Sequence, residues 1–194
     1  MLEKMIEYIQ MVDIKLFYAV NNGMRNPILD FIMPLITNGN IWIIPIIVLL
    51  TALLIFGNKT IRIAVLLSII AVAVMDPICY RIIKPFVGRV RPCWVLPHVN
   101  VLVNAGRFSF PSNHSANLSA VASVFGGFYR KTGIYLFGLA FIESFSRVYV
   151  GVHYPLDTVA GLIMGASFGM LVVCAYNLAK KKLNLEKGEK QCQR

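Results

Sequence analysis

The sequence predicts an all-α protein, a polytopic transmembrane helical bundle of five to six helices with an N-terminal amphipathic helix. Of its 194 residues, 57% are hydrophobic and only 14% are charged, whereas soluble domains carry about 25% charged residues. Apolar runs long enough to cross a bilayer recur along the chain between short polar turns. We therefore expect one membrane-embedded domain over 1–194, with N-terminal interfacial helices (1–40), a core bundle (41–179) and a cytoplasmic tail (180–194).

Residues 2–22 alternate apolar and polar residues with the period of a helix, but they are too polar for a comfortable membrane span. A helix lying on the membrane surface is the favoured interpretation, and a tilted span is the alternative. We expect its polar side to carry Glu3, Lys4, Glu7, Gln10, Asp13 and Lys15. A short apolar segment over 27–37 ends at Asn38-Gly39-Asn40. The first residues lack the apolar core and cleavage site of a signal peptide, so none is expected.

Five spans are predicted from the remaining apolar runs: 41–56, 61–83, 112–129, 134–145 and 156–178. Asp76-Pro77 interrupts the second, and we expect Asp76 to cap a restarted helix or to pair with a nearby basic residue. Arg130-Lys131 is expected to form a tight turn. The fifth span carries a glycine at every fourth position, 161, 165 and 169, and this small-residue ladder predicts close helix packing in lipid.

The formal net charge is +10, but no basic stripe interleaved with aromatic residues suggests nucleic-acid binding. Five spans place the turns at 57–60 and 130–131 and the tail on one side, with ten of the nineteen basic residues. Of the nine others, three are assigned to chemistry below, which leaves six. By the positive-inside rule the tail is cytoplasmic and the long loops face outward.

Three segments with potential chemistry fall on this outward face: Lys84–Pro92, Pro111–His114 and Ser146–Asp157. Basic residues so near a membrane interior need an anion to face. In the third segment, Pro155 suits the first turn of a helix, so His153 lies just ahead of the helix and Asp157 lies inside its first turn. That spacing lets the carboxylate reach one imidazole nitrogen while the other faces outward, as a nucleophile or base beside an anion-binding helix end.

Other polar residues receive structural assignments. Glu143, four residues before Arg147, is expected to pair with it on one helix face. The four cysteines, Cys79, Cys93, Cys174 and Cys192, are scattered without metal-ligand spacing, so neither a metal site nor a disulfide framework is expected.

The pattern Lys-x6-Arg-Pro, then Pro-Ser-x-His, then Ser-Arg-x5-His-x3-Asp resembles the type 2 phosphatidic acid phosphatase superfamily, membrane lipid phosphatases that share their site with vanadium haloperoxidases. The matching positions run from Lys84 to Asp157. One residue departs from the pattern, because Asn113 stands where the family usually has glycine. Asparagine keeps the backbone N–H and adds side-chain donors, but it is bulkier beside a phosphate.

The resemblance implies a mechanism. His153 would attack phosphorus to give a phosphohistidine, with Asp157 orienting its ring. His114 would protonate the departing oxygen and then activate water. The phosphoryl oxygens would be held by Lys84, Arg91, Ser112, Asn113 and Arg147. Positioning and charge stabilisation carry most of phosphoryl transfer, so neither a metal nor another cofactor is expected.

The expected function is that of a lipid phosphatase of a bacterial inner membrane, with its active site facing the periplasm. Undecaprenyl pyrophosphate and lipid A 1-phosphate are the favoured substrates, while phosphatidylglycerol phosphate and phosphatidic acid stay open. The expected partners are the lipid substrate and the bilayer, with no obligatory protein partner. The alternatives are a non-catalytic phospholipid-binding or transport protein, which would show internal repeats, and a vanadium haloperoxidase, which a short membrane-embedded chain disfavours.

Overall fold

The computed structural model describes residues 1–192 and confirms the all-α class, since an isolated Val90–Phe108 bridge is the only β pairing in that part of the chain. Four-residue helices and one π-helix, η1, accompany the longer helices. In chain order the elements are α1 (Leu2–Asn21), α2 (Pro27–Thr37), α3 (Gly39–Phe56), α4 (Lys59–Pro77), η1 (Ile78–Ile83), α5 (Lys84–Val87), α6 (Pro92–Val95), α7 (Asn113–Phe128), α8 (Arg130–Tyr149) and α9 (Pro155–Cys192).

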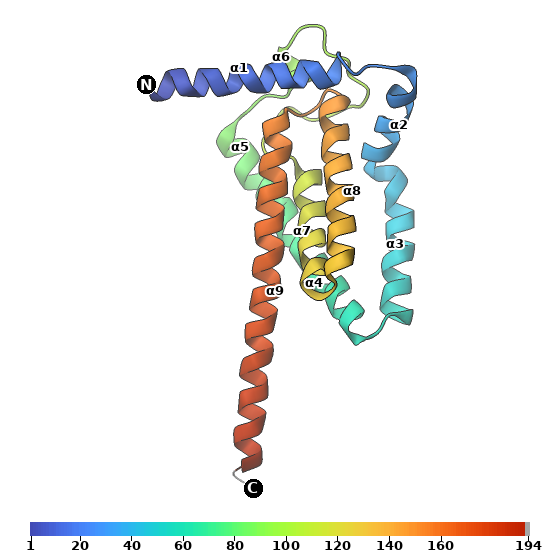
Figure 1. The fold of residues 1–194 in the computed structure, drawn as a ribbon, viewed down its shortest axis with the longest axis vertical. Coiled ribbons are helices and arrows are strands. Elements are labelled where there is room, and N and C mark those ends of the chain that lie inside the picture. Colours follow the sequence, from blue (N-terminus) through green and yellow to red (C-terminus); the bar gives the residue numbers. More distant parts are fainter. Residues whose placement is uncertain (193–194) are drawn as a thin grey trace.

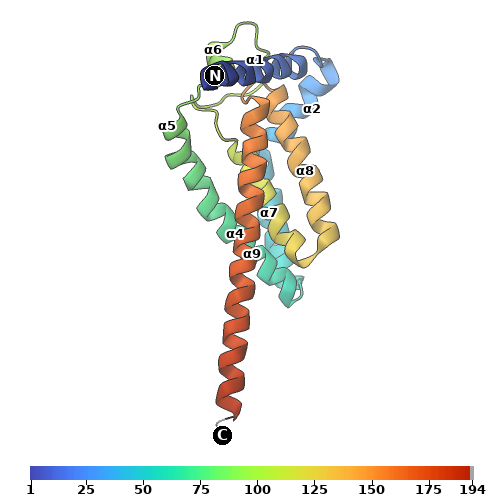
Figure 2. The same ribbon diagram turned by 60° about the vertical axis from the view of Figure 1, so that its left-hand side comes forward.

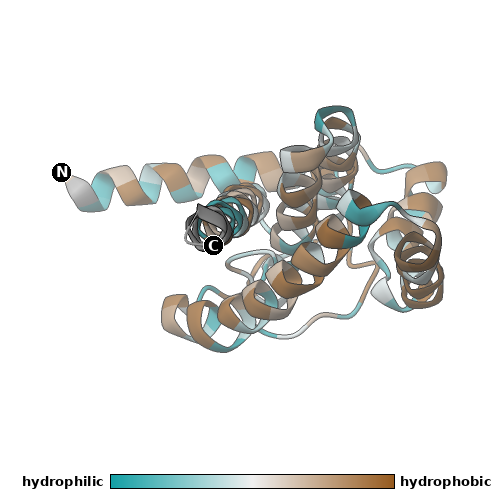
Figure 3. Cartoon of the chain, turned by 90° about the horizontal axis from the view of Figure 1, so that it is seen from below, coloured by the Kyte–Doolittle hydropathy of each residue, from teal (hydrophilic) through white to brown (hydrophobic). Residues whose placement is uncertain are grey.

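Within the described residues, three helical stretches are long and apolar enough to cross a membrane: Gly39–Phe56, Lys59–Val87 and Pro155–Asn184. Helices α7 and α8 run beside α9 in the same bundle (Figures 1 and 2). The bundle helices carry much apolar surface (Figure 3), and α3 has no buried residue, as expected of a helix that faces lipid. The chain is thus an integral membrane protein with a helix for each predicted span.

The boundary between α7 and α8 differs from the expected basic turn. Arg130 and Lys131 are the first residues of α8, and the break falls at Tyr129, whose backbone is extended (φ −138°, ψ 90°). The tight turn at Arg130-Lys131 was therefore a wrong prediction. A single extended residue is enough to reverse the chain, so the basic pair remains free to join the helix.

Helices α7 and α9 form the closest contact in the bundle, along the glycine ladder. A Cβ atom at Gly161 would lie 2.5 Å from the carbonyl oxygen of Ser112. Cβ atoms at Gly165 and Gly169 would overlap the carbonyl oxygens of Ala116 and Ala120 in the same way. Only residues without a side chain allow the backbones to approach so closely, which confirms the packing role predicted for these glycines.

Helix α1 lies crosswise over the end of the bundle where α8 and α9 are joined (Figures 1 and 2). Residues 3–12 are exposed, whereas Phe17 and Asn21 in its second half are completely buried. Asn21 donates to the carbonyl oxygens of Asn100 (2.8 Å) and Tyr149 (2.7 Å). These contacts attach α1 to the loops at that end of the bundle.

Two polar residues lie where the sequence did not predict them. Asp13 was assigned to the polar side of α1, yet it is only 1% exposed, because its carboxylate accepts hydrogen bonds from other segments. Asp76 caps no new helix, because α4 continues through Pro77 directly into η1, and within the described part of the chain it forms no ion pair. A π-helical turn changes the winding without ending the helix. Asp76 instead accepts hydrogen bonds from Asn113 (2.9 Å) and Asn117 (2.8 Å) on α7.

Candidate active site

The loop after α5 forms one side of the site. Gly88 has a positive φ of 65° and ends α5, a backbone conformation that favours glycine. The returning chain pairs with it, since Arg91 N donates to Arg107 O (3.0 Å) and Ser109 N donates to Arg89 O (2.8 Å). Lys84, 4% exposed, donates through Nζ to the carbonyl oxygens of Ser109 (2.9 Å) and Pro111 (2.6 Å). The lysine therefore fixes this loop over the end of α5.

The imidazole of His153 lies at the centre of the site and is only 1% exposed. Its Nε2 is 2.8 Å from Arg91 Nη1, which also donates to Val152 O (2.8 Å). A guanidinium can only donate, so Nε2 accepts and carries a lone pair, and the proton of the neutral ring is on Nδ1. Burial, reinforced by the charges of Arg91 and Arg147, holds the pKa of His153 well below its ordinary value. The ring is thus neutral at physiological pH.

Asp157 lies beside the other ring nitrogen. Its Oδ2 is 3.5 Å from His153 Nδ1, which is close for electrostatic attraction but outside hydrogen-bond geometry. The carboxylate is fixed by the backbone N–H of Tyr154 (2.9 Å) and by Arg89 (2.7 Å). The carbonyl oxygen of Asp157 also accepts from Ser112 N (3.0 Å), so the starts of α7 and α9 are directly connected.

Arg147 reaches the site from the end of α8. Its Nη1 donates to Thr37 Oγ1 on α2 (2.7 Å), and Thr37 donates to Glu143 Oε1 (3.4 Å). In the described structure no ion pair joins Glu143 to Arg147 directly, so the predicted pairing is wrong. The two side chains do share a face of α8, but the threonine from α2 lies between them. The Arg147 carbonyl accepts from His153 N (3.3 Å), which ties the histidine loop to α8.

The segment Ser112–His114 starts α7. Ser112 caps the helix, and its Oγ accepts from the N–H (3.4 Å) and hydroxyl (3.0 Å) of Ser115. The Asn113 side chain is directed to α4, where its amide donates to Asp76 (2.9 Å), while its backbone N–H, the group expected to hold a phosphoryl oxygen, lies in the first turn of α7. The His114 side chain is exposed, and its Nε2 lies 4.0 Å from the position that a Cβ of Gly39 would occupy. Backbone N–H groups of a first helical turn lack helical partners and favour an anion.

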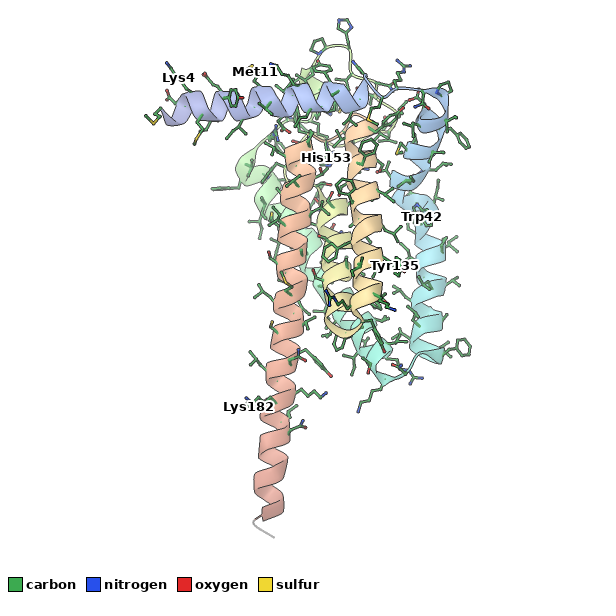
Figure 4. The ribbon with its side chains drawn as sticks, viewed as in Figure 1. Lys4, Met11, Trp42, Tyr135, His153 and Lys182 are labelled. Carbon is green, nitrogen blue, oxygen red and sulfur yellow. The ribbon has the colours of Figure 1, made fainter. Side chains whose placement is uncertain are left out.

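All three predicted segments therefore meet at one end of the bundle, the end at which His153 is drawn in Figure 4. Contacts link Arg91 to His153, His153 to Asp157, and Asp157 to Ser112. Among the described residues, no group of three histidine, cysteine or acidic side chains is arranged to hold a metal ion.

Sequence reasoning missed two residues that support the site: Asp13 and Thr37. Thr37 and Asp13 come from segments assigned to the membrane interface, and nothing in their local sequence indicates their partners. One signal was available for Asp13, because it precedes the buried Phe17 by four residues and therefore shares its helix face.

Comparison with known proteins identifies the family of this chain. The family model of the PAP2 superfamily matches residues 63–181. A lipid A 4′-phosphatase of Bacteroides thetaiotaomicron is 32% identical over 86% of this chain and 78% of its own length. The undecaprenyl-diphosphatase BcrC of Bacillus subtilis is 30% identical over 81% of this chain and 80% of its own.

A solved structure is similar as well. The transmembrane PAP2-type phosphatidylglycerolphosphate phosphatase of Bacillus subtilis superposes with a TM-score of 0.70 at 27% identity, covering 89% of this chain and 87% of that one. Fold and comparisons together thus define an integral membrane protein in which the three predicted segments meet at one end of the helical bundle. The chain belongs to the PAP2 superfamily of membrane lipid phosphatases, and it is a hydrolase of phosphoric esters. The predicted resemblance is confirmed.

Proposed function

We propose that this protein hydrolyses the phosphate or pyrophosphate group of a bacterial envelope lipid through a phosphohistidine on His153. One observation carries the proposal. Lys84, Arg91 and Arg147 are 4%, 8% and 7% exposed around a neutral imidazole, and none of them forms an ion pair in the described structure. Buried cations without a counter-ion are costly, and a phosphoryl group supplies the missing negative charge.

The chemistry follows from the protonation state of the ring. Nε2 of His153 forms the bond to phosphorus while the bond from phosphorus to the lipid oxygen breaks, and His114 gives that oxygen a proton. A water molecule then attacks the phosphohistidine, His114 takes one of its protons, and the nitrogen–phosphorus bond breaks to release phosphate. Asp157 stabilises the charge that the ring acquires through Nδ1. The three cations and the N–H groups at the start of α7 stabilise the transferring oxygens.

The substrate proposed first is a lipid A phosphate, and undecaprenyl pyrophosphate is the second candidate. The lipid A 4′-phosphatase and the undecaprenyl-diphosphatase among the relatives support these two choices. The 4′-phosphate thus joins the 1-phosphate favoured from sequence, since a site that recognises phosphate distinguishes poorly between two glucosamine phosphates.

Phosphate release by the detergent-purified protein tests this proposal. The panel contains lipid A, undecaprenyl pyrophosphate, phosphatidylglycerol phosphate and phosphatidic acid in mixed micelles, with EDTA present throughout. We expect release from at least one of the first two and inhibition by orthovanadate, which mimics pentacoordinate phosphate. Full activity of His153→Ala would contradict the mechanism, and no release from any lipid would contradict the function.

The proposed location is the bacterial inner membrane, with the site facing the periplasm and the C-terminus in the cytoplasm. The excess of basic residues in the turns and tail on the C-terminal side supports this orientation. Fusion reporters at Arg194 test it. A fluorescent protein that matures only in the cytoplasm should be bright, and an alkaline phosphatase that needs the periplasm should be inactive. The reverse result would overturn the orientation.

A further inference from the structure

Helix α1 contributes a buried carboxylate to the surroundings of the candidate site. Asp13 Oδ2 accepts from Arg89 Nη2 (2.6 Å), and Asp13 Oδ1 accepts from the backbone N–H of Leu156 (2.9 Å). Leu156 is the second residue of α9, so its N–H has no partner within that helix. One side chain of the crosswise helix therefore binds both the loop after α5 and the start of α9.

Arg89 connects Asp13 to Asp157 at the centre of the site. Its Nη1 donates to Asp157 Oδ1 (2.7 Å), while its Nη2 is held by Asp13. The guanidinium lies 4.0 Å from the ring centroid of Tyr154, and Phe17 of α1 packs against the same ring with centroids 5.7 Å apart. Burial opposes the charge of Arg89, but the two carboxylates more than compensate and raise its pKa. The guanidinium is thus a permanently charged link with a fixed orientation.

A chain of contacts runs from α1 through Arg89 and Asp157 to the ring of His153. Asp157 Oδ2, the oxygen 3.5 Å from His153 Nδ1, belongs to the carboxylate that Arg89 holds by its other oxygen. The carboxylate can therefore rotate only if Arg89 moves, and Arg89 is restrained by Asp13. We propose that Asp13 is a positioning residue for catalysis, which acts through Arg89 and Asp157 to orient the histidine. This inference rests on the proposed function of His153.

The proposal predicts a specific kinetic defect in the full-length protein. Asp13→Asn keeps the side-chain shape and one acceptor for Leu156, but it removes the charge that holds Arg89. With the lipid that turns over fastest in the panel above, we expect kcat to fall about 10- to 100-fold, the size of effect expected from misplacing a reacting group by about 1 Å. KM and inhibition by orthovanadate should stay within about threefold, because the phosphate-binding cations are untouched. Glu7→Gln, an exposed acid on the same helix, is the matched control and should behave like the wild type.

A double-mutant cycle separates positioning from general support of the fold. If Asp13 acts through Arg89, adding Asp13→Asn to Arg89→Ala should cost little more than Arg89→Ala alone. Additive losses, or an Asp13→Asn protein with unchanged kcat, would overturn the inference. If Asp13→Asn lacks a thermal transition, Arg89→Lys is the second variant. It keeps the charge but cannot bind both carboxylates, and an unchanged kcat in it would equally overturn the proposal. An active His153→Ala would instead indicate failure of the proposed function.

Discussion

The two histidines stand at the starts of neighbouring helices, yet the exposure of their side chains differs. His153 precedes α9, is almost fully enclosed, and contacts a cation on one ring nitrogen and a carboxylate on the other. His114 lies in the first turn of α7 and is exposed, and the structure describes no hydrogen bond to its ring. The difference separates two chemical requirements. In the proposed mechanism, the nucleophile His153 needs a fixed direction and one protonation state, whereas His114, which would transfer protons to a lipid oxygen and from water, needs access to both.

The strongest test of this difference between the two histidines is to remove the exposed ring of His114. His114→Ala should lower phosphate release from lipid substrates about 10²- to 10⁴-fold, the usual size of a general acid–base contribution. With p-nitrophenyl phosphate, whose leaving group needs no proton, phosphoryl transfer to the enzyme should still occur. Rapid quenching under non-acidic conditions should then detect accumulated phosphoenzyme. His153→Ala should yield none. A phosphoenzyme that persists in His153→Ala but vanishes in His114→Ala would reverse the assigned roles.

A second prediction concerns the contact that brings the two helix starts together. Gly165→Ala places a methyl group against the Ala116 carbonyl oxygen, so α7 and α9 must separate, at a cost of about 1–3 kcal/mol. We expect a lower melting temperature in detergent and about a tenfold loss of activity. Gly138→Ala on α8 is the matched control, because nothing lies within 4 Å of the added atom. Equal melting temperatures for the two variants would argue against the glycine ladder as the basis of the close contact.

The pH dependence of kcat/KM sharpens the description of the enclosed ring. Burial and the nearby arginines lower the pKa of His153, so protonation removes the nucleophile only at a pH well below 6.5, the ordinary value. The acid limb of the profile should therefore lie well below that pH. Arg91→Gln removes one of the charges that lower the pKa of His153, and the acid limb should move upward, whatever the loss in absolute rate. A wild-type midpoint at 6.5 would mean that the ring is not held neutral.

The smallest effect is expected at the position that departs from the family pattern. Asn113→Gly removes the side chain that donates to Asp76 (2.9 Å) but keeps the backbone N–H. The lost hydrogen bond should cost about 1 kcal/mol of stability, and the rate should stay within about threefold, because the amide is directed to α4. A large change in relative rates across the lipid panel would show that Asn113 contacts the substrate.

The site was predictable where chemistry follows from local spacing. His153, Pro155 and Asp157 define the start of α9, and Ser112 defines the start of α7, since capping and proline preferences act within one turn. The contacts of Asp13 with Arg89 and of Thr37 with Arg147 span 76 and 110 residues. Such pairs depend on how whole helices pack, which hydrophobic period alone does not specify. Likewise, Asp76-Pro77 looked like a helix boundary because a π-helical continuation leaves no clear mark in the sequence.

The guanidinium of Arg91 on Nε2 of His153 has a consequence for the resting enzyme. In the proposed mechanism, the lone pair that attacks phosphorus is the one that accepts from Arg91, so the arginine must release it before attack. A phosphoryl oxygen is a stronger hydrogen-bond acceptor for the arginine than an imidazole nitrogen is. When a phosphoryl group binds and takes over this hydrogen bond, the lone pair of Nε2 becomes free to attack. A lipid with an uncharged headgroup would leave the hydrogen bond between Arg91 and His153 in place. In the proposed mechanism, the substrate itself thereby activates His153.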